Sequence, residues 1–272
     1  MNRATFLAAA LALLSLGAGF ARAEDPQKIT ITGSSTVAPL VLEIAKRFEK
    51  QNKGVRVDVQ TGGSSRGIND ARSGLASIGM ASRALKSEES DLKGFTIAND
   101  GICVILNKSN TVAKLSNEQV KGIYTGQIRN WKEVGGKDAP ITVVNKAEGR
   151  STLELFLSFY ALKNSDIKAQ VVIGDNAQGI KTVSGNPNSI GYVSIGTAEF
   201  EADAGTPIKL LAMDGIAPSM ASVANGKFPL SRPLTLVTKE TPQGLVKRFI
   251  DFAQSQAVHD LVKEQFFVPL AR

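Results

Sequence analysis

Short apolar segments rich in β-branched residues alternate with longer amphipathic segments along nearly the whole chain. Apolar runs of four to eight residues are typical of strands that are buried on both faces of a sheet. We expect ten strands, at residues 28–32, 55–61, 77–81, 95–98, 102–107, 141–145, 170–173, 190–194, 208–213 and 234–237. Regular alternation of strands and helices predicts the α/β class, with mostly parallel sheets flanked by helices.

Three of the amphipathic segments predict helices with a clear apolar face. Residues 37–50 place Leu40, Ile44 and Phe48 on one side, and residues 151–162 are similar. Residues 242–255 follow a threonine that can cap the helix and begin with a proline at the first helical position.

The chain shows no repeat, low-complexity tract or Pro/Ser-rich linker that would separate two domains. Two lobes would therefore be joined by strands, and we expect the crossovers at residues 102–107 and 190–196. On this division residues 24–105 and 197–272 form the first lobe, and residues 106–196 form the second.

The first 23 residues have the pattern of a secretory signal peptide. Asn2 and Arg3 give a polar, positive start, an apolar stretch follows from residue 6 to 20, and Ala21-Arg22-Ala23 offers a small-x-small cleavage site. We therefore expect cleavage near Ala23 and a soluble periplasmic protein.

Composition and charge narrow the choice of partner. The chain is 43% hydrophobic, 21% charged and 6% aromatic, with a formal net charge of +7, and its basic residues are scattered. Nucleic acids are bound by a basic stripe interleaved with stacking rings, so this class is disfavoured. A modest positive field that attracts small anions fits better.

Three segments share one design, in which a strand runs into Gly and Ser/Thr and a helix starts at once. They are residues 33–36, 62–67 and 148–152. Such turns present backbone N–H groups and hydroxyl donors at the positive end of a helix dipole. Three of them, with Arg66, Arg83 and Arg150 in or near them, predict a site that encloses a small oxyanion.

Structural roles compete with ligand binding at each of these turns. Ser151 and Glu154 can form a capping box, which would account for both side chains but not for Arg150 or Gly149. Residues 34–36 carry more hydroxyls than one helix cap needs. Ser82 and Arg83 follow a strand directly, and Lys146 ends another strand, where a solvated lysine is an equal alternative.

Enzyme signatures are weak in this sequence. The single histidine is His259 in a late helical segment, and no metal-binding or nucleophile motif is present. Cys103, the only cysteine, lies in an apolar run where a buried inert thiol is expected. We therefore expect a binding protein that has no catalytic residues, no cofactor and no metal.

The ordered combination of motifs resembles the phosphate-binding protein of the phosphate ABC importer. The resemblance spans nearly the whole mature chain and rests on residues 31–39, 62–68, 78–83, 100–102, 123–126, 130–131, 149–152 and 191–193. It implies a type II periplasmic-binding-protein fold, with two α/β lobes that are joined by two strand crossovers and close on phosphate in the cleft.

Together the turns and the resemblance define a set of expected phosphate contacts. The main set is Ser35, Thr36, Val37, Ser64, Ser65, Ser82, Arg83, Arg150, Ser151 and Thr152, and a second set is Ser34, Arg66, Gly149 and Lys146. The best-known family members carry an aspartate at the position of Arg83, an arginine at Lys146 and a serine at Arg150. The guanidinium has thus moved within the turn, which can preserve a bidentate oxyanion contact.

The resulting hypothesis is a monomeric periplasmic protein that captures inorganic phosphate and delivers it to the permease subunits of an ABC transporter. One alternative keeps the class and changes the ligand to sulfate, molybdate or another tetrahedral oxyanion. A second alternative is a secreted phosphatase, and a third is a sensor whose phosphate occupancy another protein reads.

Overall fold

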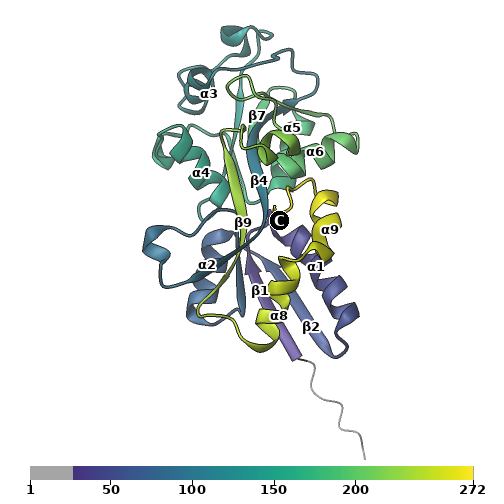
Figure 1. The fold of residues 1–272 in the computed structure, drawn as a ribbon. Helices are drawn as coiled ribbons and strands as arrows, with labels where there is room; N and C mark the ends of the chain where they lie inside the picture. Colours follow the sequence, from purple (N-terminus) through teal and green to yellow (C-terminus); the bar gives the residue numbers. More distant parts are fainter. Residues whose placement is uncertain (1–26, 272) are drawn as a thin grey trace, which may run out of the picture.

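The computed structural model describes residues 27–271, and these form a mixed sheet flanked by helices (Figure 1). The strands are β1 (Gln27–Gly33), β2 (Val55–Thr61), β3 (Ile78–Ala81), β4 (Lys93–Asn107), β5 (Thr142–Lys146), β6 (Val171–Ile173), β7 (Ser189–Ser194), β8 (Ile208–Leu210) and β9 (Ser231–Thr238). The α/β class expected from the sequence is confirmed. The expected signal peptide lies outside the described residues.

Nine α-helices lie between or after the strands in this part of the chain. They are α1 (Ala38–Gln51), α2 (Ser64–Ser73), α3 (Asn117–Tyr124), α4 (Ser151–Phe159), α5 (Asn176–Gly185), α6 (Ile195–Asp203), α7 (Met220–Ala224), α8 (Gly244–Ala253) and α9 (His259–Glu264). Four 3-10 turns lie at Ser87–Glu89, Trp131–Val134, Asn164–Asp166 and Gln256–Val258. No helix between residues 27 and 271 has the length and apolar character that a membrane span requires.

The sheet follows the order β2-β1-β3-β9-β4-β7-β5-β6, and β8 pairs with β4. Strand β4 makes this continuity possible, because its first part pairs with β9 and its second part with β7. The pairings of β1 with β2 and β3, and of β5 with β6 and β7, are parallel. The antiparallel pairings all involve β4 or β9.

The sequence predicts two strands where the structure forms the single strand β4. The sequence suggests a break because residues 99–101 are Asn-Asp-Gly, which is typical of a turn. Here these residues stay extended, because Asn99, Asp100 and Gly101 pair with residues 231–233 of β9. An apparent turn sequence is therefore overridden by a strand partner that lies 130 to 134 residues later.

Two large hydrophobic cores lie on either side of this long strand. The first core combines β1, α1, β3, α8 and α9 with residues up to Ala98 and from Leu234 onward. The second core contains residues from Ile102 to Leu230. Figure 1 shows the elements of the two cores as the lower and upper halves of the molecule, with β4 and β9 running between them.

The residues of each core indicate where the chain passes from one lobe to the other. Residues 198–230 pack in the second core through side chains such as Ala198, Ile208 and Phe228. We therefore propose a first crossover near residues 98–102 and a second one at residues 230–234. These positions differ from the crossovers expected at residues 102–107 and 190–196, because Ile102–Leu106 of β4 and Ile190, Tyr192 and Val193 of β7 pack in the second core.

Candidate functional site

A small pocket lies where the two cores meet, and most of its lining comes from the starts of helices. Ser34, Ser35, Thr36, Gly63, Ser64 and Ser82 line it from the first core, and Lys146, Arg150, Ser151, Thr152, Gly174 and Asn176 line it from the second. The cavity volume is only about 10 Å³. The pocket therefore suits a compact ion better than an extended organic substrate.

Helices α2 and α4 begin at the pocket without a side-chain cap. The N-cap residues are Gly63 for α2 and Arg150 for α4, and neither helix has a side-chain hydrogen bond to its first turn. The capping box, which is the structural alternative to ligand binding for Ser151 and Glu154, does not form. First-turn N–H groups that neither a side chain nor a backbone carbonyl satisfies are available to an anion, and the helix dipoles favour negative charge there.

Two contacts hold these helix starts close together. Ser65 N donates a hydrogen bond to the Gly149 carbonyl at 3.2 Å, and this bond joins the two lobes. Gly63 has φ +95°, and a Cβ atom at this position would lie 2.8 Å from the Gly149 carbonyl oxygen and 3.0 Å from Arg150 Cδ. Glycine is therefore required both by the backbone conformation and by the approach of the second lobe.

Several pocket hydroxyls already accept a hydrogen bond from the protein. Ser64 Oγ accepts from Ser82 N at 3.2 Å, and Ser34 Oγ accepts from Thr36 N at 3.2 Å. Thr36 Oγ1 accepts from the side-chain amide of Asn176 at 3.1 Å. A hydroxyl that accepts in this way keeps its own proton free to donate. These side chains are therefore arranged as donors to an anion.

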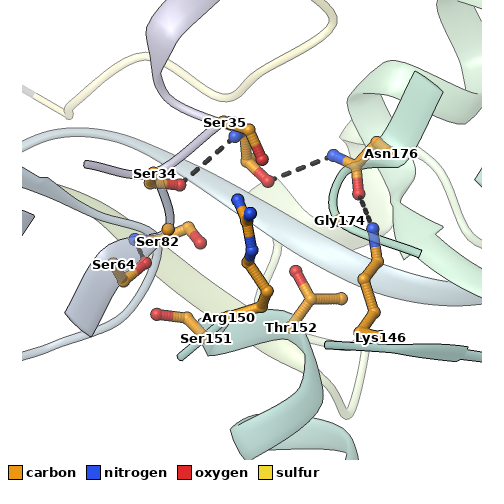
Figure 2. Close-up of a pocket in the computed structure, with 12 residues that line it drawn as sticks. Ser34, Ser35, Ser64, Ser82, Lys146, Arg150, Ser151, Thr152, Gly174 and Asn176 are labelled. Carbon is orange, nitrogen blue, oxygen red and sulfur yellow. Dashed lines mark hydrogen bonds between the residues drawn. The ribbon is translucent and has the colours of Figure 1, made fainter. Parts of the chain in front are cut away.

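Ser151 and Arg150 have unused hydrogen-bonding capacity. Ser151 Oγ is buried and has no hydrogen-bond partner among residues 27–271. The Arg150 guanidinium, half-buried, forms no hydrogen bond or ion pair with another described residue. Figure 2 shows it in the middle of the site, with Ser34 and Ser82 on one side and Asn176 on the other. A buried donor without a partner is expected to meet one in the bound state.

Lys146 supplies a second positive group from the end of β5. Its side chain is 3% exposed, and Nζ donates to Asn176 Oδ1 at 2.7 Å. Burial lowers the pKa of Lys146 to about 7, and repulsion from Arg232 and Arg150 contributes while Asp175 opposes the change. The charge of Lys146 is thus poorly compensated when the pocket holds no anion, and an anion would stabilise it.

Five of the expected site residues lie outside the pocket lining. Arg83 is buried with Glu89, to which it donates two hydrogen bonds of 2.7 and 2.8 Å, and its Nε lies 3.1 Å from Glu154 Oε2. Arg66 is exposed and pairs with Asp70 at 3.2 Å. The others are Val37, Ser65 and Gly149. The other nine expected residues of the two sets line the pocket.

Sequence reasoning missed Asn176 and Arg232. Asn176 begins α5 two residues after Gly174, which directly follows β6, so this segment has the same strand–glycine–helix design as the other turns. That signal was present in the sequence. Arg232 stands inside a strand beside a proline, and only its pairing with β4 brings it behind the pocket. No local pattern reveals such a position.

The lining contains no Asp or Glu side chain. No group of His, Cys, Asp and Glu residues that could hold a metal ion occurs within the described part of the chain. The site therefore offers hydroxyl, amide, ammonium and guanidinium donors around a small space. This chemistry can strip water from an oxyanion and hold it.

Comparison with known proteins agrees with this geometry. The model of the PBP superfamily domain matches residues 21–257. The phosphate-binding protein PstS of Bacillus subtilis is 32% identical over 248 residues, covering 89% of this chain and 80% of the relative. The chain belongs to the PstS family within the PBP superfamily.

Other relatives give the same result. PstS of Borreliella burgdorferi is 30% identical over 256 residues, covering 90% of this chain and 91% of the relative. A substrate-binding protein from Clostridium perfringens, solved with bound phosphate, is 36% identical with a TM-score of 0.82. An ABC-type phosphate transport receptor from Vibrio cholerae is 32% identical with a TM-score of 0.74. Both structures are covered completely, and each covers 90% of this chain. The expected two-lobed type II fold is thereby confirmed.

Proposed function

We propose that this protein captures inorganic phosphate in the cleft between its lobes and delivers it to the permease of an ABC transporter. The observation that carries the proposal is the Arg150 guanidinium, which lies free of protein partners within the described residues at the centre of a ring of donors. The phosphate bound to the relative from Clostridium perfringens supports the same ligand.

The strength of binding can be bounded from the donor set. Hydrogen bonds to charged groups contribute about 1.5–3 kcal/mol each. Roughly four such bonds, less the cost of ordering two lobes, are compatible with about −8 kcal/mol, which corresponds to micromolar affinity or tighter. We infer one phosphate per chain, bound by a monomer without turnover. We also infer that the protein acts in the periplasm after export.

Calorimetric titration of the purified protein with inorganic phosphate tests this function. The expected result is a 1:1 complex with micromolar or tighter affinity. A protein that gives no heat with phosphate but binds another oxyanion would have a different ligand. A colorimetric phosphatase assay with and without divalent metal ions separates binding from catalysis, and significant turnover would contradict the proposal.

Sulfate is a second candidate, favoured by one specific observation. The pocket lining has no carboxylate to accept the proton of monohydrogen phosphate. Arg83 stands where the best-known family members carry an aspartate. Competition between phosphate and sulfate, measured as the pH crosses the second ionisation of phosphate, distinguishes the two ligands. A phosphate site keeps its preference for phosphate on both sides of that ionisation.

A further inference from the structure

Arg232 and Asp100 form a buried ion pair directly behind the pocket. The two residues face each other across β9 and β4 in antiparallel register. Their side chains are each 1% exposed, and Asp100 Oδ2 accepts from Arg232 Nη2 at 2.8 Å and from Nε at 3.1 Å. Asp100 Oδ1 also accepts from Gly196 N at the start of α6. The guanidinium is therefore fixed in position by contacts that no ligand provides.

The remaining nitrogen of Arg232 reaches two hydroxyls that line the pocket. Arg232 Nη1 donates to Thr152 Oγ1 at 2.9 Å and to Ser82 Oγ at 3.2 Å. Arg232 itself does not line the pocket. Each hydroxyl has one proton and two lone pairs, so accepting from a guanidinium leaves its proton free for the ligand. A hydrogen bond from a charged donor also polarises the hydroxyl and strengthens its own donation.

The two hydroxyls belong to opposite sides of the cleft. Ser82 directly follows β3 of the first core, whereas Thr152 is in the first turn of α4 in the second core. One nitrogen atom can contact both only when the two lobes are as close as they are here. The bridge therefore links the orientation of the hydroxyls to closure of the cleft.

We propose that Arg232, held by Asp100, is a positioning residue that makes Ser82 and Thr152 obligatory donors to the bound anion and joins the lobes around it. This inference rests on the proposed function of the pocket as an anion site. It adds a residue that touches no ligand atom and yet sets the ligand affinity.

A double-mutant cycle measured by calorimetry with inorganic phosphate tests the inference. Thr152→Val is expected to weaken phosphate binding at least tenfold when Arg232 is present, but less than threefold in an Arg232→Gln background. Ser82→Ala is expected to behave in the same way. Arg232→Lys keeps the charge but not the fork of donors, and it is expected to recover part of the affinity. Independent, additive losses would overturn the proposal.

Further variants show whether a loss of affinity comes from a loss of folding. Arg232→Gln leaves Asp100 buried without a cation, so the cycle is repeated with Asp100→Asn and Arg232→Gln combined. If neither glutamine background folds, the cycle in Arg232→Lys decides, because a single lysine nitrogen is not expected to hold both hydroxyls. Arg47→Gln removes an exposed ion pair with Asp260 outside the pocket lining and is expected to leave affinity within twofold of the wild type.

The two proposals fail in different ways. A wild-type protein that does not bind phosphate contradicts the proposed function. The cycle is then measured with the tetrahedral oxyanion that the protein does bind, because the orientation of the hydroxyls applies to any acceptor. Arg232→Gln affinity within threefold of the wild type, for that anion, overturns the inference.

Discussion

Replacing Lys146 by methionine is predicted to stabilise the ligand-free protein and to weaken phosphate binding. Burial lowers the pKa of Lys146 from 10.5 to about 7, so below pH 7 the folded protein must keep a charged ammonium out of water. At 1.36 kcal/mol per pKa unit, this costs about 5 kcal/mol. Methionine keeps a similar unbranched side chain and removes the charge.

Part of this gain is lost through Asn176. Its Oδ1 accepts from Lys146 Nζ at 2.7 Å, and an unsatisfied buried acceptor costs about 1–3 kcal/mol. We therefore expect Lys146→Met to raise the free energy of unfolding by about 2–4 kcal/mol at pH 6. The phosphate affinity is expected to fall about 10- to 100-fold, because a charge-assisted bond of roughly 1.5–3 kcal/mol is removed.

The difference in unfolding free energy between Lys146→Met and the wild type is expected to depend on pH. Between pH 7 and 10.5 the unfolded wild-type chain binds more protons at Lys146 than the folded protein does, so wild-type stability rises with pH in this window. The advantage of Lys146→Met therefore shrinks above pH 7 and disappears near pH 9. Urea unfolding of phosphate-free protein at pH 6, 7.5 and 9 measures it, with the exposed Lys227→Met as control.

Two results would refute this reasoning. Lys146→Met could be less stable than the wild type at pH 6, or its difference from the wild type could be the same at all three pH values. In either case the lysine would not be held at an electrostatic cost. Unchanged phosphate affinity would mean that the ammonium does not contact the anion.

Three further substitutions test individual side chains. Arg150→Ala should weaken phosphate binding at least tenfold in calorimetry with little change in the melting temperature of the free protein, and unchanged affinity would show that this guanidinium is not the charged contact. Arg83→Ala should lower the unfolding free energy by about 3 kcal/mol, because it breaks a buried pair with Glu89, yet change phosphate affinity less than threefold. A larger loss of affinity would place Arg83 in the site. Gly63→Ala should reduce both phosphate affinity and stability. Gly54 also has positive φ but open space around it, so Gly54→Ala should reduce stability only. Equal phosphate affinities of these two variants would contradict the close approach at Gly63.

Most strands and the three glycine-rich turns could be predicted from the sequence, because each depends on local patterns. Strand β2 has the predicted bounds, and α1 and α4 begin within one residue of the predicted positions. Helix α8 begins at Gly244, two residues after the proline expected at its first position. Capping residues in the sequence predict the first residue of a helix only to within about two positions, because the residues that follow can also start the helix.

The orientation of side chains at the site could not be predicted in the same way. Arg83 is next to the lining residue Ser82 in the sequence, but ion pairs with Glu89 and Glu154 hold its guanidinium outside the pocket lining. Conversely, Arg232 becomes important only through its cross-strand partner Asp100. Both outcomes depend on pairs of charged residues brought together by tertiary structure, which a single sequence does not specify.

A crystal structure of the protein grown with inorganic phosphate tests the central claim most directly. We expect one tetrahedral anion in the pocket, bonded to the Arg150 guanidinium, the Lys146 ammonium and backbone N–H groups at the starts of α2 and α4. Its hydroxyl donors are expected to be Ser64, Ser82, Ser151 and Thr152. A phosphate bound at another surface, or a pocket that holds only water at saturating phosphate, would contradict it.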